Sequence, residues 1–483
     1  WRLEDLEEWT WDPTGYADLA GAAIYGLMAR DSAPATERLV HVAARLEQFP
    51  RLFEQIRAAL DPARVPRIHA ETAIAQNRGV LSVLSDLVEP ELEDLPEVSA
   101  ERDRLLASIG LARATVEDHQ TWLENELLPA ARGDFRIGAE KFDRKLAYAL
   151  HTPITRSEIR RRAEAMLIEI HERMYEIGLR IIAEDAASGA GRRGGPPIDE
   201  DRLDVIREAL EVVYRDRPRR GEIVATAKEF LGQATTFVRR AKIVTVPDDP
   251  VEIIVMPEFR RGVALAYCDA PGPLDRGQKT FYAVAPLPAA WTPEQNRSFL
   301  REYNKMGLQV LTMHEAMPGH FVQIAHGNRH PSTLRALLPS AVFIEGWAEY
   351  IEEMMVEEGY LERDPKLHLI VLKLYLRSIT NAIIDQGVHA EGMTREQAMD
   401  YMIGQAFQEE REAAGKWVRA QLTSSQLSTY FVGYLEHLDL RRQAEDRAGK
   451  DFDLLTYHDR VLSFGSPPVQ FVRALMFDLP IPE

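Results

Sequence analysis

Apolar residues recur at steps of three and four along almost the whole chain, and this period predicts a mainly helical fold. Segments such as 35–49, 101–128 and 156–185 keep one apolar face over several turns. The exception lies at about 241–288, where the short runs "AKIVTV", "VEIIVM", "GVALAYC" and "KTFYAVA" are β-rich and bounded by Pro, Asp and Gly. We therefore expect a mainly α fold with a small β-sheet in this interval.

The helical pattern is the same on both sides of this interval, which favours a single body over separate domains. A large helical enzyme of 483 residues can form one continuous structure. We expect one domain over 1–483, with a helical N-terminal part (1–240), the small sheet (241–288) and a second helical part (289–483).

Composition limits which binding partners and which cellular compartment can be expected. The net charge of −18 comes from 58 basic and 76 acidic residues, without a basic stripe, so no nucleic acid partner is expected. The single cysteine, Cys268, excludes an intrachain disulfide and fits a reducing compartment. No apolar run approaches the ~20 residues that span a bilayer, so no membrane partner is expected. These features favour a cytoplasmic location, although a removed export signal is compatible with a chain that begins at Trp1; the oligomeric state is left open.

The segment "LTMHEAMPGHF" (311–321) places His314 and His320 six residues apart, whereas four residues put two zinc ligands on one face of a helix. In a regular helix six residues turn the chain by roughly 600°, which leaves the two side chains about 240° apart. Pro318 cannot donate to the carbonyl of His314, and Gly319 permits unusual dihedrals, so we expect the helix to bulge or break here. A bulge that absorbs two residues would return both histidines to one face. The alternative is a helix that ends at Pro-Gly, with His314 buried and His320 as a cap.

A catalytic zinc ion takes three protein ligands and keeps one position open. The segment "SAVFIEGWAEYIEEMM" (340–355) offers the third, because Glu345, Glu349 and Glu352 lie along one flank of the predicted helix. Such a strip is usually a solvated face. Glu345, in the first turn, is the preferred ligand and Glu349 is its competitor. Glu315, next to the first histidine, is placed to take a proton from a water activated by the metal.

A polar stripe crosses an otherwise aliphatic helix predicted over 367–392. It consists of Arg377, Asn381, Asp385 and His389, which follow one another at four-residue steps. The stripe is either a row of hydrogen bonds within the helix or the wall of a wet cavity near the metal.

Four segments together resemble one protein family: "HEAMPGHFVQ", "FIEGWAEYIEE", "DQGVHAEGMTREQAMDYM" and the stretch 428–468. In this order they are similar to the bacterial domain-of-unknown-function family 885, which itself looks like a relative of the gluzincin zinc peptidases. The similarity runs from about residue 65 to the C-terminus. It implies a metallopeptidase-like fold with the sheet next to the active-site helix, and one Zn²⁺ per chain held by His314, His320 and Glu345.

The resemblance also implies roles for residues outside the metal site. The family's DxGxH element falls on Asp385, Gly387 and His389, and its YxxG element falls on Tyr430 and Gly433. Tyr430, with His389 as a second candidate, is expected to stabilise the developing oxyanion. Asp385 is expected to contact the substrate.

The implied activity is that of a zinc-dependent hydrolase that cleaves peptide bonds of short peptides. Tyr282, in the run "KTFYAVA", is expected on an edge strand against which an extended peptide pairs. Arg441 or Arg442 is expected to receive a substrate carboxylate. The family usually carries an aliphatic residue where Glu349 stands, so a carboxylate beside the proposed ligand is a departure from its pattern.

Two alternatives remain beside the peptidase. One is an amidohydrolase that acts on a non-peptide amide, since no residue identifies an α-amino-acid substrate. The other is a helical protein that binds a metal without catalysis. The presence of Glu315 argues against this alternative, because ligand geometry alone does not require a carboxylate at that position. Two histidines and a glutamate favour zinc, but Mn²⁺ or Co²⁺ could occupy the same site.

Overall fold

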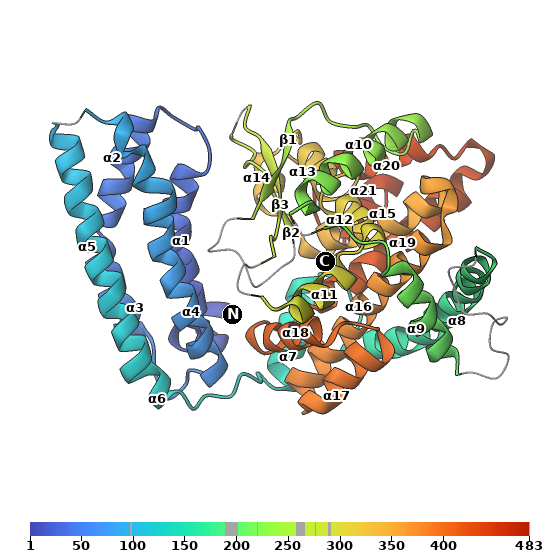
Figure 1. Cartoon of the computed structure of the whole chain (residues 1–483), viewed down its shortest axis with the longest axis horizontal. Coiled ribbons are helices and arrows are strands. Elements are labelled where there is room, and N and C mark those ends of the chain that lie inside the picture. Colours follow the sequence, from blue (N-terminus) through green and yellow to red (C-terminus); the bar gives the residue numbers. More distant parts are fainter. Residues whose placement is uncertain are drawn as a thin grey trace. The chain divides into compact units, whose positions relative to one another are not determined.

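The computed structural model describes residues 1–96, 99–188, 201–219, 221–256, 266–275, 277–287 and 291–482. This part of the chain is mainly helical and carries one small sheet (Figure 1). The predicted fold class is therefore confirmed.

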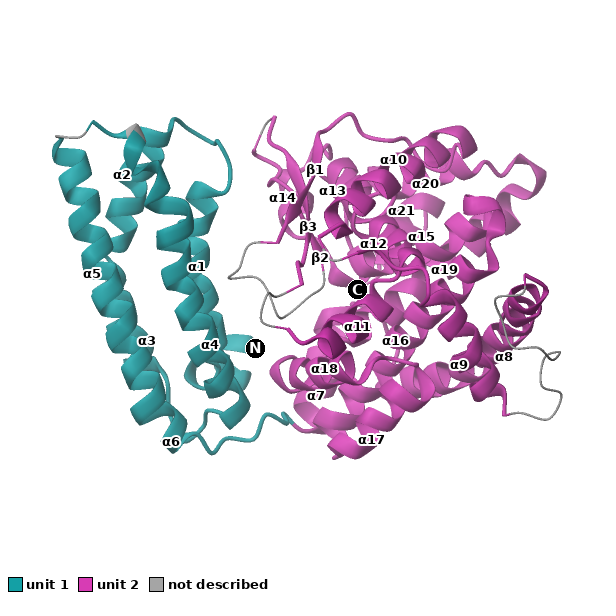
Figure 2. Cartoon of the chain, viewed as in Figure 1, with its two compact units in different colours: residues 1–137, 257–262 teal, residues 138–256, 263–483 magenta. Residues whose placement is uncertain are grey.

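The described residues gather into two compact units (Figure 2). Unit 1 takes in residues 1–137, and unit 2 takes in residues 138–256 and 263–483. This division differs from the single body expected from the sequence, since the boundary at 137/138 falls inside the part that was expected to be continuous. The helical period is the same on both sides of the boundary, and it does not reveal which helices share a core.

Unit 1 is a set of helices around an apolar core of its own. Leu39, Val42, Phe53, Ile109 and Val116 are among the fully buried side chains of that core. The helices of unit 1 are α1 (Thr14–Met28), α2 (Ala35–Leu46), α3 (Phe49–Ala59), α4 (Arg67–Val83), α5 (Ala100–Trp122) and α6 (Leu128–Ala130). Because the core draws on five of these helices, the unit does not depend on the rest of the chain for its apolar contacts.

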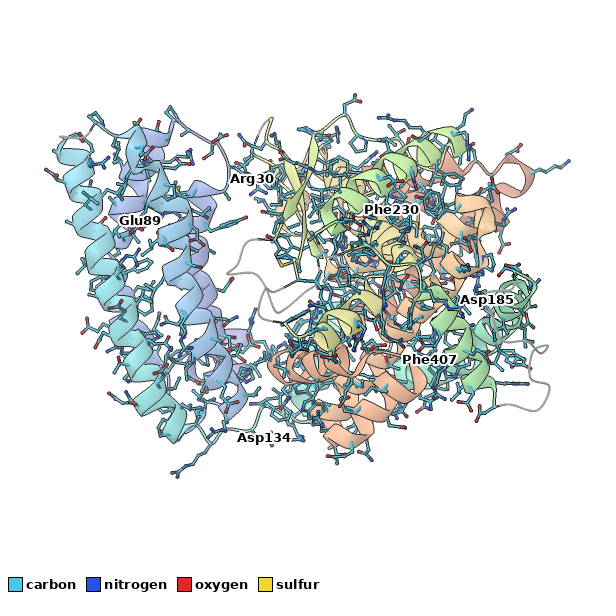
Figure 3. The ribbon with its side chains drawn as sticks, viewed as in Figure 1. Arg30, Glu89, Asp134, Asp185, Phe230 and Phe407 are labelled. Carbon is cyan, nitrogen blue, oxygen red and sulfur yellow. The ribbon has the colours of Figure 1, made fainter. Side chains whose placement is uncertain are left out.

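Unit 2 is built around the helix α16. Its helices are α7 (Ala139–Leu150), α8 (Arg156–Ala187), α9 (Arg202–Val213), α10 (Ile223–Ala241), α11 (Pro293–Glu302), α12 (Lys305–Glu315), α13 (His320–Gly327), α14 (Thr333–Leu337), α15 (Ala341–Glu357), α16 (Pro365–Ala390), α17 (Arg395–Met399), α18 (Glu410–Leu422), α19 (Ser428–Ala448), α20 (Leu454–Ser463) and α21 (Val469–Phe477). Buried aromatic side chains such as Phe230 and Phe407, labelled in Figure 3, belong to the interior of this unit.

Among the described helices, α16 is long and apolar enough to cross a membrane by length and composition. In the protein, however, 83% of the apolar stretch is buried against other elements. Such burial is typical of a core helix, and α16 contacts α8, α12 and α19 in unit 2. Its apolar character is therefore explained by packing.

The sheet has three strands in the order β1-β3-β2, with β1 (Val251–Val255) parallel and β2 (Ala266–Asp269) antiparallel to β3 (Thr280–Val284). The run "KTFYAVA" is thus the central strand, and the expectation of an open edge there is wrong. Tyr282 is fully buried, with its hydroxyl 3.4 Å from Oγ1 of Thr312, so its side chain is not available to substrate. The run "AKIVTV" forms the end of α10 and a loop rather than a strand, and residues 262–265 of "GVALAYC" lie outside the described residues.

Candidate metal centre

A break between α12 and α13 brings the two motif histidines together. The peptide bond before Pro318 is cis, and the backbone N–H of Gly319 donates to the carbonyl of Met313 (2.9 Å). A Cβ on Gly319 would lie 1.9 Å from the carbonyl oxygen of His314, so the backbone can take this path only with glycine. The rings of His314 and His320 end with their centroids 4.6 Å apart at an interplanar angle of 85°. The interruption predicted from Pro-Gly is present, and it cancels the six-residue offset.

Glu345 on α15 lies against both imidazoles. Its Oε2 is 3.8 Å from Nε2 of His314 and 3.6 Å from Nε2 of His320, and one donor atom from each residue fits within a span of 4.8 Å. These separations are too long for hydrogen bonds. A tetrahedral zinc ion with bonds of about 2.0–2.2 Å holds its ligand atoms about 3.4 Å apart, so the donors fit a small cation between them. The structure brings the three predicted ligands together; that they bind a metal stays a prediction.

Glu352 orients His314, a role that the sequence analysis missed. Nδ1 of His314 lies 2.7 Å from Oε1 of Glu352, an arrangement in which the imidazole donates Nδ1–H and turns Nε2 toward Glu345. Burial lowers the pKa of His314, but Glu345 and Glu352 outweigh it and hold that pKa well above its usual value. Burial raises the pKa of Glu345, but His314 and His320 outweigh it and hold that pKa well below its usual value. The cluster is therefore arranged to hold positive charge.

The competing carboxylate, Glu349, lies outside this donor cluster. Its Oε1 accepts a hydrogen bond from the hydroxyl of Ser378. Burial, reinforced by the charge of Glu352, raises the pKa of Glu349 to about 8. A carboxyl group that is mostly protonated at neutral pH is a poor metal ligand, so the geometry and the charge both favour Glu345.

A close crossing of α15 and α19 sets the position of the cluster's glutamate. A Cβ on Gly346 would lie 2.3 Å from the carbonyl carbon of Gly433, and a Cβ on Gly433 would lie 2.2 Å from the carbonyl oxygen of Val342. The two backbones can meet this closely only because both residues are glycine. Next to the crossing, Nε1 of Trp347 donates to the carbonyl of Pro318 (3.0 Å) and ties α15 to the break between α12 and α13. Within the segment "EGWA", the close contact at Gly346 and the hydrogen bond of Trp347 thus fix the position of Glu345 from both sides.

The general-base candidate, Glu315, is the last residue of α12 and directly follows His314. Its side chain is buried, with 7% of the residue exposed. The pKa of Tyr282 is raised mainly by burial, and the carboxylate of Glu315 adds to the increase. Glu315 therefore follows the first clustered histidine directly and lies near the buried Tyr282 of the central strand.

Tyr430, in the first turn of α19, lies near the cluster on the helix that crosses α15. Burial, followed by the charge of Glu345, raises the pKa of Tyr430, so its phenol stays protonated and can donate at neutral pH. Nη2 of Arg419 donates to the hydroxyl of Tyr430 (3.2 Å) and to Oε1 of Gln426 (2.8 Å). The position suits the predicted oxyanion donor, and Arg419 is a neighbour that the sequence motifs did not single out.

Asp385 does not face the metal cluster, and its predicted contact with substrate is wrong. It accepts hydrogen bonds from the backbone N–H of Ser425 (2.9 Å), the backbone N–H of Ser428 (3.0 Å) and the hydroxyl of Ser428 (2.8 Å). The polar stripe is therefore no row of bonds within α16, since Arg377 likewise pairs outward with Glu412 (2.6 Å). Asp385 orders the start of α19.

His389 has a structural role rather than the predicted role at the oxyanion. Its Nε2 lies 2.8 Å from the carbonyl oxygen of Ala420 and 2.9 Å from that of Thr423, so this ring N–H is directed at the end of α18. Together with Asp385 it holds the loop between α18 and α19. Asp385 and His389 of the DxGxH element thus order the loop that leads to Tyr430.

Arg441 is not placed for substrate either. Its guanidinium donates to Glu445 on the same helix (2.8 Å) and to Glu357 at the end of α15 (3.1 Å). Arg442, the other residue considered, is exposed on α19. Because its N–H groups already donate to two glutamates, Arg441 helps to join α15 to α19 and does not depend on a substrate carboxylate for a partner.

Fold and site together define a mainly helical protein with a largely buried His-His-Glu donor cluster at a broken helix. The sequence pattern of one family matches residues 1–476, and the chain belongs to this family, described as "Bacterial protein of unknown function (DUF885)". The match begins at residue 1, well before the start near residue 65 expected from the motifs. No curated protein matches the chain.

Two solved structures share the fold. A "putative lipoprotein of unknown function" from Shewanella oneidensis is 33% identical, with a TM-score of 0.79, and the match covers 99% of this chain and 84% of that one. A "putative lipoprotein" from Colwellia psychrerythraea is 22% identical, with a TM-score of 0.73, and the match covers 92% of this chain and 76% of that one. The second likeness is one of fold alone.

Proposed function

We propose that this protein is a zinc-dependent hydrolase that cleaves peptide bonds of short peptides, in the manner of the gluzincin peptidases. The observation that carries the proposal is the cluster of His314, His320 and Glu345, with donor atoms within 4.8 Å and a buried glutamate, Glu315, beside it. Two imidazoles and one carboxylate are a ligand set typical of catalytic rather than structural zinc.

When bound, zinc supplies a Lewis acid that polarises a carbonyl and lowers the pKa of water toward about 7. His314, His320 and Glu345 would hold it, and Glu352 would keep Nε2 of His314 free of a proton. Glu315 would accept a proton from the attacking water and deliver it to the nitrogen of the leaving amine. Tyr430 would donate a hydrogen bond to the oxyanion of the tetrahedral intermediate.

Metal content and peptide hydrolysis, measured on the same samples, test this proposal. We expect about one zinc per chain in protein purified without chelator, and no zinc in His320→Ala. A mixture of short peptides, followed by mass spectrometry, should be cleaved by the zinc-loaded protein, lose cleavage on chelation and regain it when zinc is restored. Zinc binding without cleavage of any peptide would overturn the peptidase assignment, and absence of metal under zinc-replete conditions would overturn the site.

Glu352→Gln is expected to weaken zinc binding by roughly 10- to 100-fold, the usual cost of losing a carboxylate that orients a histidine ligand. The amide can still accept the hydrogen bond from Nδ1 of His314, but it no longer adds negative charge. Zinc affinity is measured by competition with a chromogenic chelator. Glu358→Gln, an exposed glutamate just beyond the end of α15, is the control and should leave the affinity unchanged. Equal affinities in the two variants would contradict the role given to Glu352.

The location of the protein stays a prediction. The single cysteine fits the cytoplasm. The 33%-identical relative is described as a putative lipoprotein, which favours export of this chain instead. Fractionation of cells that express the full-length protein distinguishes the two.

A further inference from the structure

Two basic side chains on α18, Arg419 and Lys416, form no ion pair with a carboxylate among the described residues. They lie three residues apart, on one side of the helix. Lys373, a buried cation of the same unit, is paired with Glu302 (2.7 Å). Charged side chains are rarely buried without a partner, so the two residues on α18 need an explanation.

Arg419 is the nearer of the two to the proposed reaction site. Its two hydrogen bonds, to Tyr430 and Gln426, both come from Nη2, and both acceptors are neutral. The N–H groups of Nε and Nη1 have no acceptor in the described part of the chain. Nη1 can therefore donate to a carboxylate, and a bidentate contact would require Nη2 to exchange one of its two neutral acceptors for the second carboxylate oxygen.

Lys416 is more deeply placed, with 8% of the residue exposed, and no hydrogen bond or ion pair to its ammonium occurs within the described residues. Burial is the main cause that holds its pKa well below the usual value, the charges of Arg377 and Arg419 add to it, and the carboxylates of Glu412 and Glu349 act in the opposite direction. Arg377 is itself neutralised by Glu412, at 2.6 Å. A second negative charge brought to Arg419 would therefore stabilise the charged form of Lys416 as well.

We propose that Arg419, supported by Lys416, binds the free C-terminal carboxylate of the peptide, so that the enzyme removes the last residue of its substrate. The inference rests on the proposed function and adds the substrate class to it. Nη2 of Arg419 is 3.2 Å from the hydroxyl that would meet the scissile carbonyl oxygen. Consecutive residues of an extended chain are about 3.3–3.6 Å apart, so a carboxylate held at Arg419 belongs to the residue just after the scissile bond.

The reaction needs no further reactant. Water adds across the C–N bond, the hydroxyl goes to the acyl carbon and a proton goes to the nitrogen of the released amino acid. The released residue keeps the carboxylate that Arg419 binds. An amide at the C-terminus of the substrate would put a neutral group against the charge of Arg419 and lose this interaction.

Binding of matched ligands tests the inference apart from turnover. The receptor is zinc-loaded Glu315→Gln protein, and the probes are N-acetyl-Ala-Ala-Ala with a free C-terminal carboxylate and the same peptide as the C-terminal amide. Calorimetric titration should find the free acid bound at least about 10-fold more tightly than the amide, as expected for hydrogen bonds to a charged group. Adding Arg419→Gln should remove this preference while leaving the affinity for the amide unchanged.

Arg411→Gln, an exposed arginine on the same helix that stacks on Trp291, is the matched control and should keep the preference. Lys416→Met is the second variant if Arg419→Gln does not fold, and it should reduce the preference in the same direction. Equal binding of acid and amide, or binding of neither, overturns the inference. An unchanged preference for the free acid over the amide in both Arg419→Gln and Lys416→Met would also overturn the inference.

The hydrolysis assay separates this failure from failure of the proposed function. If the wild-type protein cleaves acid- and amide-terminated peptides equally, it is a peptidase without the carboxylate subsite. If it cleaves neither peptide but binds the acid selectively through Arg419, the subsite is real and the assigned reaction is wrong.

Discussion

Glu315→Gln is expected to lower peptide hydrolysis by roughly 10²- to 10⁴-fold, the usual contribution of a positioned general base. The change keeps the size of the side chain, and the carboxamide cannot accept a proton. Glu315 is not one of the three clustered donors, so zinc content should stay at the wild-type level. Turnover of a short peptide and metal content, measured on the same preparation, test the expected loss of activity and the expected retention of zinc.

Glu410→Gln, an exposed glutamate at the start of α18, controls for the loss of one negative charge. It should leave turnover and zinc content as in the wild type. Loss of zinc from Glu315→Gln would show that this residue is a ligand, and undiminished turnover would remove it from the mechanism. Either result would require another proton acceptor for the reaction.

The break at Pro318 and Gly319 was predictable because it follows from local chemistry. A proline cannot complete the hydrogen bond four residues back, and a glycine permits the backbone path that follows. The consequence for His314 and His320 was predictable only as one of two alternatives. Whether the bulge turns both rings to one side depends on what holds the break, and Trp347, 29 positions after the proline, supplies that contact.

The choice between Glu345 and Glu349 illustrates the same limit. A helical period places both carboxylates on one flank of α15, and it does not say at what height α12 crosses that flank. The hydrogen bond from Trp347 to the carbonyl of Pro318 fixes that height, and the crossing of Gly346 with Gly433, 87 positions apart in sequence, holds α15 against α19. Once that contact exists, Glu345 lies against the imidazoles and Glu349 against Ser378.

The errors at Asp385, Arg441 and Tyr282 share one cause. Each residue lies in a segment that favours a functional role, and each is satisfied by a partner far along the chain. Asp385 is bonded to residues 40 and 43 positions later, and the helical period of its own segment does not indicate a partner at that distance. The resemblance to a family located the important residues, but it did not separate those that touch substrate from those that position the loop.

Gly433→Ala should destabilise unit 2 by about 3 kcal/mol, at the upper end of the usual cost of overpacking. The added methyl would lie 2.2 Å from the carbonyl oxygen of Val342 and 2.7 Å from Cα of Gly346, and both are backbone atoms that no rotamer change can move. Separation of α15 from α19 would shift Glu345 and Tyr430 at the same time. We therefore expect a lower midpoint of thermal unfolding by circular dichroism together with weaker zinc binding.

Gly232→Ala is the matched control, because Gly232 is exposed on α10 of the same unit and a Cβ there meets nothing within 4 Å. It should be neutral or raise stability by up to about 1 kcal/mol, the helix preference of alanine over glycine. If Gly433→Ala unfolds at the same temperature as Gly232→Ala and binds zinc equally well, the close crossing does not set the position of Glu345. If Gly433→Ala loses stability but keeps zinc affinity, the crossing supports the fold alone, and the glutamate is held mainly through Trp347 and the break at Pro318.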